Sequence, residues 1–493
     1  MCVGGGVLGV YHKRRLPNYG VFDEERWFAP GTTELELYEV AGVPMGVSIC
    51  EDLWFPAGPV SAQAAAGAQL VVNINASPYS IGRLADRKAV ARLRSSESGC
   101  TIAYVNQVGG QDELVFDGGS FIVDPVGNVL AEAPQFTENA LLVDISGPDV
   151  AADGAPRGTD GGAGPRPQRM PVLPVSATPR ASSPLPPPPP AEELSREAEV
   201  YGALVLGTRD YLRKNGFSDA VIGLSGGVDS SLVAAIAVDA LGAEHVHGLS
   251  LPSMYSSEGS RADAAVLAMH LGIELHTLSI ERAHEAFSKL LVPLLGGMPA
   301  GLTDENLQSR IRGVVLMAVS NMQGWIVLTT GNKSEMATGY STLYGDTAGG
   351  FAVIKDVPKT LVFDLCRYRN TRAGTDLIPE SVLNKAPSAE LRFDQRDDQS
   401  LPPYEVLDPV LDALVLNDRS IADVAGDGFD VDLVAKVASL VDTAEYKRRQ
   451  SPPGVRISAK AFGKDRRIPI TNRYRDHAPA SAGASSTHAS PRA

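Results

Sequence analysis

The chain has 493 residues and carries 44 Lys and Arg against 58 Asp and Glu, which gives a formal net charge of −14. This length predicts two or three domains, and the acidic balance excludes the broad basic face that nucleic-acid binding requires. The sequence has no run of about 18 apolar residues and no closely spaced cysteine pair, so it predicts no membrane span, no zinc site and a reduced, cytoplasmic protein.

The first 148 residues show the patterns of a mixed α/β domain. Short apolar runs typical of strands lie at 44–49, 69–74, 101–105 and 120–123. Helical patterns lie between some of them, at 62–66 and 84–96. This mixture predicts an α/β domain over residues 1–148.

A sharp change of composition follows. Of the 40 residues from 151 to 190, 12 are Pro and 5 are Gly, and none is aromatic. Such a segment buries too little apolar surface to fold, and the prolines at 186–190 favour a stiff polyproline II rod. We therefore predict a linker over 149–192, and the polar composition of 477–493 predicts a disordered tail.

The second block, residues 193–476, alternates more regularly. Apolar runs typical of strands lie at 220–224, 245–251, 273–279 and 325–330, and helical segments at 230–241, 260–271 and 304–322 separate them. Strands joined through helices predict right-handed crossovers and a doubly wound parallel sheet. Because such a sheet binds its ligands at the carboxyl ends of its strands, functional motifs should follow strands directly.

A glycine-rich loop follows the first strand of this block. The strand at 220–224 runs into the sequence SGGVDSS (225–231) and then a helix. Two glycines allow a tight turn, and the backbone N–H groups, the serine hydroxyls and the helix N-terminus supply donors for an anion. The loop lacks the GxxxxGK[ST] pattern of a Walker A motif and instead resembles the SGGxDS loop of enzymes that split ATP into AMP and pyrophosphate. In that resemblance Asp229 helps to hold Mg²⁺; in the alternative, Asp229 and Ser230 only cap the helix.

Further sequence strings indicate which family of these ATP-splitting enzymes the chain resembles. TTGNKSE (329–335) follows the strand at 325–330, and STLYGD (341–346), KDVPK (355–359), PSAELRFDQRDDQSLPPYEVLD (387–408) and EYKRRQSPPG (445–454) come after it. Together they resemble the glutamine-dependent NAD synthetases, whose synthetase domain is of the ATP pyrophosphatase type. The resemblance implies Mg²⁺ as cofactor, with Asp229 and Glu335 as its ligands. It implies ATP binding by Gly223, Leu224, Ser225, Gly226, Gly227, Val228, Asp229, Ser230, Thr330 and Lys359, and deamido-NAD binding by Asn306, Arg310, Glu335 and Lys447.

The reaction implied by this family is a carbon–nitrogen ligation in two steps. The nicotinate carboxylate of deamido-NAD attacks the α-phosphate of ATP, and pyrophosphate leaves. Ammonia from glutamine then displaces AMP and gives the amide, NAD. Positioning and electrostatics should dominate catalysis, because no side chain has to act as a nucleophile in these steps.

A cysteine and a lysine in the first block resemble a second family. Cys50 follows the apolar run at 44–49, and Lys13 lies 37 residues before it in the string YHKRRLPNYG (11–20). By itself a cysteine on a strand is more often inert packing. The pair, with PNYGVFDEERWF (17–28), resembles the nitrilase-type glutaminase domain, an αββα sandwich with a Glu, Lys and Cys triad. The resemblance implies a homo-oligomer in which Cys50 is the nucleophile, Lys13 stabilises the oxyanion, and glutamine is bound by Tyr19, Ser77 and Arg83.

One member of that triad has no counterpart in this sequence. The family's glutamate lies upstream of the lysine, whereas residues 1–22 contain no Asp or Glu, and the first glutamate is Glu24. We assign neither Glu24 nor Glu25 as the general base. The sequence therefore predicts a glutaminase domain over 1–148 that is N-terminally incomplete, and we expect its uncovered strands to lower solubility.

Three alternatives stay open at this point. A stand-alone carbon–nitrogen hydrolase is disfavoured by the missing glutamate and by the intact SGGVDS loop. A non-catalytic nucleotide-binding scaffold would bind ATP without releasing pyrophosphate. A synthetase that amidates a different acid on the same loop is disfavoured by the TTGNKSE and STLYGD strings.

Overall fold

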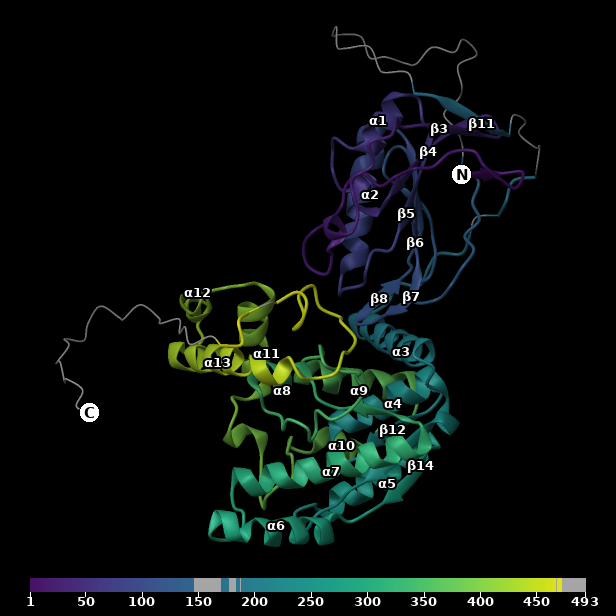
Figure 1. The fold of residues 1–493 in the computed structure, drawn as a ribbon. Helices are drawn as coiled ribbons and strands as arrows, with labels where there is room; N and C mark the ends of the chain where they lie inside the picture. Colours follow the sequence, from purple (N-terminus) through teal and green to yellow (C-terminus); the bar gives the residue numbers. More distant parts are fainter. Residues whose placement is uncertain (146–169, 177–182, 187, 467, 472–493) are drawn as a thin grey trace, which may run out of the picture. The chain divides into compact units, whose positions relative to one another are not determined.

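The structure, a computed structural model, describes residues 1–145, 170–176, 183–186, 188–466 and 468–471. It divides the chain into two compact units, one of Met1–Gly110 with Leu114–Ala203 and one of Gln111–Glu113 with Leu204–Ala493 (Figure 1). The predicted tail at 477–493 and most of the predicted linker lie outside the described residues. Within the described ranges, no helix combines the length and the apolar character needed to cross a membrane.

The first unit is built on a seven-stranded mixed sheet. Its strands follow the order β10-β9-β6-β5-β4-β3-β11, and β4, β5 and β6 run parallel at its centre. The strand bounds are β3 Leu37–Val40, β4 Val43–Ile49, β5 Leu70–Asn75, β6 Thr101–Asn106, β9 Phe121–Val123, β10 Val129–Glu132 and β11 Val172–Ser176. The helices of this unit are α1 Pro59–Ala65 and α2 Arg83–Ser98, and two hairpins outside the sheet are β1 Cys2–Val3 with β2 Gly6–Val7 and β7 Val108–Gln111 with β8 Leu114–Asp117.

Helices α1 and α2 cover one face of this sheet (Figure 1). The core beneath them contains Val71 of β5 and Ile102 of β6. Because side chains alternate between the faces of a strand, Ile74 and Val105 point to the opposite face. There they are 51% and 46% exposed. The described residues of the first unit thus form one seven-stranded sheet with a helical layer on one face.

Strand β11 lies inside the segment predicted to be a linker. It runs parallel to β3 at the edge of the sheet, where Val172 pairs with Leu37 and Pro174 pairs with Glu39. An edge strand tolerates proline, because one side of it needs no hydrogen-bond donor. The composition of residues 151–190 does not indicate this strand, because prolines and glycines around it dominate the average composition of the segment. Pro187, within the predicted polyproline rod, lies outside the described residues.

The second unit is built on five parallel strands in the order β14-β13-β12-β15-β16. Their bounds are β12 Ala220–Gly223, β13 Val246–Ser250, β14 Glu274–Thr277, β15 Ile326–Thr329 and β16 Phe351–Ala352. The chain adds β13 and β14 on one side of β12 and then returns to add β15 and β16 on the other. This topological switch opens a ligand crevice at the carboxyl ends of β12 and β15. The predicted doubly wound parallel sheet is confirmed.

Helices flank this sheet and continue beyond it. Around the sheet they are α3 Arg196–Lys214, α4 Val228–Leu241, α5 Glu258–Leu271, α6 Glu281–Leu295 and α7 Leu302–Gln323. The later helices are α8 Lys333–Thr338, α9 Lys359–Ala373, α10 Glu380–Asn384, α11 Tyr404–Leu411, α12 Ile421–Gly426, α13 Val431–Thr443 and α14 Glu445–Arg448. Residues of α8, α11, α12 and α13 share one buried core, which includes Ala337, Leu407, Val424 and Val437. Every strand and helix predicted above is present, with bounds that differ by a few residues.

Candidate functional site

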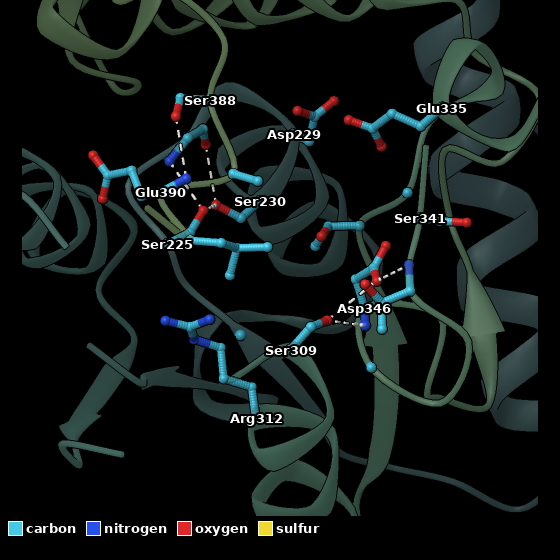
Figure 2. Close-up of a pocket in the computed structure, with 18 of the residues that line it drawn as sticks. Ser225, Asp229, Ser230, Ser309, Arg312, Glu335, Ser341, Asp346, Ser388 and Glu390 are labelled. Atoms are coloured by element: carbon cyan, nitrogen blue, oxygen red, sulfur yellow. Dashed lines mark hydrogen bonds between the residues drawn. The ribbon is translucent and has the colours of Figure 1, made fainter. Parts of the chain in front are cut away.

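A cavity of about 430 Å³ lies at the carboxyl ends of β12, β13 and β15 in the second unit. Figure 2 shows side chains from several elements converging on it. The cavity is lined by all but one of the residues predicted for ATP and deamido-NAD: Gly223, Leu224, Ser225, Gly226, Gly227, Val228, Asp229, Ser230, Asn306, Thr330, Glu335, Lys359 and Lys447. The exception is Arg310.

The glycine-rich loop forms the floor of the cavity. Gly226 has a φ of +77°, and Gly227 precedes the first residue of α4, so the N-terminus of this helix opens into the cavity. Ser225 Oγ lies 3.2 Å from Ser230 Oγ and accepts a hydrogen bond from the N–H of Gly227 at 3.2 Å. Backbone N–H groups, hydroxyls and a helix dipole therefore converge as an anion site requires.

Two carboxylates and one ammonium meet beside this loop. Figure 2 shows the carboxylates of Asp229 and Glu335 facing one another. Lys359 Nζ forms an ion pair with Asp229 and lies 3.7 Å from Glu335 Oε1. Burial raises the pKa of Glu335 to about 8, and the charge of Asp229 adds to this rise. Burial lowers the pKa of Lys359, but Asp229 and Glu335 outweigh it, and the net shift is upward.

The start of α8 positions Glu335. Asn332 precedes the helix, and its Oδ1 accepts a hydrogen bond from the N–H of Glu335 (3.0 Å) while Glu335 Oε2 accepts one from the N–H of Asn332 (3.2 Å). This is a capping box, which fixes the first turn of the helix. Asn332 Nδ2 also donates to Asp229 Oδ1 at 2.9 Å. The GNKSE segment thereby ties both carboxylates into one network.

The wall formed by α7 does not include one of the predicted residues, Arg310. Leu302, Glu305, Asn306, Ser309, Arg312, Gly313 and Leu316 all line the cavity, at the spacing of three and four residues that marks one helical face. Arg310 lies off this face and is exposed, and its Nε donates to the carbonyl oxygen of Leu343 at 3.2 Å. The cavity cation on α7 is therefore Arg312, which helical periodicity from Asn306 could have found.

Arg312 is held in place by one backbone contact. Its Nε donates to the carbonyl oxygen of Leu251 at 2.9 Å, and Figure 2 shows its guanidinium directed into the cavity. Burial lowers its pKa to about 10, which leaves it charged at neutral pH. Lys447 lies at the same cavity and donates to the carbonyl oxygens of Gly339 and Ser341, at 2.7 Å each.

Lys385 contacts the glycine-rich loop, and the PSAEL string that follows it contacts the start of α5. Glu390 accepts hydrogen bonds from the N–H of Ser257 (3.2 Å) and from Ser260 Oγ (2.7 Å). Lys385 Nζ donates to Ser260 Oγ (2.9 Å) and to the carbonyl oxygen of Gly226 (3.3 Å). In the sequence this string indicates only the family, and in the structure its first residues line the cavity.

In the first unit, Cys50 directly follows strand β4 and begins a short 3₁₀ helix, Cys50–Leu53. Its φ is +43°, a strained value for a residue with a side chain, of the kind found at functional sites. Lys13 Nζ contacts both carboxylate oxygens of Glu24, at 2.6 Å each. Burial raises the pKa of Cys50 to about 11; Lys13 opposes this rise, while Glu51 and Glu24 add to it. The structure thus brings Cys50, Lys13 and Glu24 together.

Asp52 holds the lysine segment beside the cysteine. Its fully buried carboxylate accepts hydrogen bonds from Tyr11 Oη (2.7 Å) and from the N–H groups of Arg15 (2.9 Å) and Ile49 (3.1 Å). Tyr11 and Arg15 flank Lys13 in the sequence, and Ile49 precedes Cys50. One carboxylate therefore joins the two segments that carry the predicted catalytic pair.

The three residues predicted to bind glutamine differ in their surroundings. Tyr19 Oη donates to Glu51 Oε1 at 2.9 Å, and burial together with Glu51 raises its pKa to about 12. Arg83 lies over the ring of Trp54, with 4.3 Å between its Cζ atom and the ring centroid. Ser77 is buried, and its hydroxyl accepts a hydrogen bond from Arg87 Nε at 3.1 Å. The hydrogen bond from Arg87 therefore fixes the position of the Ser77 hydroxyl.

We expect the alkylation rate of Cys50 by iodoacetamide to rise about tenfold per pH unit between pH 7 and pH 10. The reactive species is the thiolate, and with a pKa of about 11 its fraction grows in proportion to the hydroxide concentration over that range. Peptide-resolved mass spectrometry measures the rate at each cysteine, with the exposed Cys2 as the internal reference. A Cys50 rate that levels off below pH 9 would contradict a protonated resting thiol.

Comparison with known proteins covers both units. A family model described as NAD synthase matches residues 200–451, and one described as carbon-nitrogen hydrolase matches residues 3–154. A glutamine-dependent NAD(+) synthetase of Thermotoga maritima is 47% identical over an alignment of 487 residues that covers 96% of this chain and 82% of the relative. One of Acinetobacter baylyi is 44% identical over 471 residues, 96% of this chain and 81% of the relative. The solved structure of a glutamine-dependent NAD+ synthetase from Acinetobacter baumannii, in complex with adenosine diphosphate, matches with 40% identity and a TM-score of 0.65, over 96% of this chain and 81% of that one.

Proposed function

Because the chain belongs to the glutamine-dependent NAD(+) synthetases, which are ATP-dependent carbon–nitrogen ligases, we propose that each unit carries one half of the reaction. The second unit forms NAD from deamido-NAD, ATP and ammonia, and the first unit releases ammonia from glutamine. The observation that carries this assignment is the group of Asp229, Glu335 and Lys359 beside the glycine-rich loop. We also propose that the chain acts as a homo-oligomer, as the family resemblance implies.

The adenylation step uses the floor of the cavity. The N–H groups of the loop and the N-terminus of α4 bind the pyrophosphate part of ATP. A carboxylate oxygen of deamido-NAD forms a bond to the α-phosphorus, and the bond from that phosphorus to the oxygen of the leaving pyrophosphate breaks. Lys359 and Arg312 supply fixed positive charge to the phosphates in a buried cavity, where such charge acts strongly.

Mg²⁺ is the cation that suits the carboxylate pair. Asp229 and Glu335 offer hard oxygen ligands, and among the described residues no group of three or more His, Cys, Asp or Glu is arranged to hold a metal. Mg²⁺ characteristically takes one or two carboxylates and completes its shell with water and substrate phosphates. When bound, the ion neutralises charge on the leaving pyrophosphate. In the structure, Lys359 Nζ pairs with Asp229 and lies 3.7 Å from Glu335 Oε1.

The amidation step needs only ammonia at the adenylated acid. Ammonia attacks the acyl carbon, AMP leaves with the bonding electron pair, and one proton passes to solvent. In the first unit, Cys50 Sγ attacks the carboxamide carbon of glutamine and Lys13 stabilises the resulting oxyanion. The bond from that carbon to the amide nitrogen then breaks, the thiol proton leaves with the nitrogen as ammonia, and water cleaves the thioester to release glutamate and the free thiol. Glu24 orients Lys13 through its two short contacts.

Parallel assays with ammonium and with glutamine test whether the first unit releases ammonia and the second unit forms NAD. We expect Cys50→Ala to keep the ammonium-supported rate within about twofold and to lower the glutamine-supported rate by at least about 10³-fold, as loss of a nucleophile does. NAD formation is measured with deamido-NAD, ATP and Mg²⁺ in both assays. A wild-type chain that uses ammonium alone would refute a working glutaminase in this chain, and one that uses neither would refute the proposed function.

A further inference from the structure

Asp408 is a buried carboxylate that the mechanism above does not use. It lies on α11 and is 4% exposed. Its Oδ1 accepts a hydrogen bond from Ser334 Oγ (2.5 Å), and its Oδ2 accepts two from Thr360, through the backbone N–H (2.9 Å) and Oγ1 (2.8 Å). Ser334 directly precedes Glu335, and Thr360 directly follows Lys359. Asp408 therefore contacts one chain neighbour of Glu335 and one chain neighbour of Lys359.

Helix α9 depends on these contacts, because its own cap residue supplies none. The residue before the helix is Pro358, whose side chain makes no capping hydrogen bond. The first N–H groups of a helix need acceptors from outside the helix. Ser334 Oγ accepts from the N–H of Lys359 (3.0 Å), and Asp408 accepts from the N–H of Thr360. Side chains of α8 and α11 thus complete the start of α9.

A carboxylate suits this position better than an amide. All three groups that bind Asp408 act as donors, one on Oδ1 and two on Oδ2. An asparagine presents one acceptor oxygen and one N–H₂ donor. In one orientation its N–H₂ would face the N–H of Thr360, and that anchor would be lost. In the other it would face Ser334 Oγ, which would have to turn its O–H away and accept, so the bond from Ser334 to a charged oxygen would be lost.

We propose that Asp408 is a positioning residue for Glu335 and Lys359. By binding Ser334 and Thr360 at once, it sets the distance between Glu335 on α8 and Lys359 on α9. The inference rests on the proposed function of Glu335 and Lys359 in binding ATP with Mg²⁺. It assigns no chemical step to Asp408 itself.

The test measures ATP binding to the full chain by calorimetry, in Mg²⁺ and in EDTA, without deamido-NAD. We expect Asp408→Asn to weaken ATP binding in Mg²⁺ by about 10- to 100-fold, the loss typical when a hydrogen-bond partner of a metal ligand is removed. The loss should be smaller in EDTA, because Glu335 then takes no part. A merely structural role would lower the melting temperature and weaken both constants equally, and that result would overturn the inference.

Asp239→Asn is the matched control. Asp239 of α4 binds Arg369 of α9 through both oxygens, at 2.9 and 2.8 Å, ten residues beyond Lys359. The variant therefore loosens the same helix at its far end. We expect both ATP constants to stay within about twofold of wild type. A loss in Asp239→Asn equal to that in Asp408→Asn would also overturn the inference.

Two further variants keep the inference testable if Asp408→Asn does not fold. Ser334→Ala removes one anchor, and Thr360→Val removes the Oγ1 contact of the other while keeping the shape of the side chain. Each should weaken ATP binding in Mg²⁺ by roughly three- to tenfold, and unchanged binding in both would overturn the role of Asp408. A wild-type chain that binds no ATP would instead overturn the proposed function, so the two failures are distinguishable.

Discussion

Replacing Asp229 with alanine is expected to lower the rate of NAD formation by about a thousand-fold, with ammonium as with glutamine. The carboxylate of Asp229 faces that of Glu335 in the cavity, and Lys359 forms an ion pair with Asp229. Electrostatic stabilisation of a leaving pyrophosphate by a bound cation contributes several kcal/mol, and ~4 kcal/mol corresponds to roughly a thousand-fold in rate. Because both nitrogen sources use the same adenylation step, both rates should fall together.

The measurement is the initial rate of NAD and pyrophosphate release at saturating substrates. Asp239→Ala serves as a control on the same helix, since its ion pair with Arg369 lies outside the cavity. We expect that control to retain most of the wild-type rate. Retention of ammonium-supported synthesis by Asp229→Ala would refute its assignment to the cation.

Replacing Gly226 with alanine is expected to lower the catalytic rate by at least about a hundred-fold and to destabilise the second unit. A Cβ atom at this position would lie 2.1 Å from the carbonyl oxygen of Ser260, and the φ of +77° disfavours any residue with a side chain. The left-handed conformation costs roughly 1–2 kcal/mol and overpacking typically 1–3 kcal/mol more. Since the obstacle is backbone, the loop has to move, and a displacement of about 1 Å at a reacting group can cost a hundred-fold in rate.

Gly296→Ala separates the cost of the left-handed backbone conformation from the cost of the steric clash. Gly296 ends α6 with a φ of +71°, and a Cβ atom there would meet nothing within 4 Å. This control therefore carries the conformational cost without the clash. Calorimetry should show a smaller fall in melting temperature for Gly296→Ala than for Gly226→Ala, with the rate of synthesis unchanged. Equal effects of the two substitutions would refute the close approach of the loop to Ser260.

Local patterns predicted the parts of the molecule that short segments determine. The strand at 220–224, the SGGVDSS loop and the helix after it form one continuous signal, in which glycines turn the chain and apolar runs bury it. The same holds for TTGNKSE, where Asn332 and Glu335 stand at the spacing of a capping box. The local sequence of each segment determines its conformation, and both segments lie at the carboxyl ends of strands in the parallel sheet.

The rest depends on contacts between segments far apart in the chain. Arg310 and Arg312 are equivalent as charges in the sequence, and only the packing of α7 decides which of them faces the cavity. Strand β11 forms because an edge of the sheet is available to it, which average composition does not reveal. Asp408 acquires its partners 74 and 48 residues away, and no local pattern marks it as different from an ordinary helix carboxylate.

The capping of α9 by α8 and α11 also sets an order for events during translation. Lys359, the first residue of α9, leaves the ribosome about 49 residues before Asp408, an interval of roughly 2–10 s at ordinary elongation rates. During that interval the first turn of α9 lacks the acceptor that Asp408 supplies, so Lys359 has no fixed place beside Asp229. A nascent chain therefore completes its nucleotide site only after α11 has docked. A chain that ends before this helix contains the parallel sheet but not the completed site.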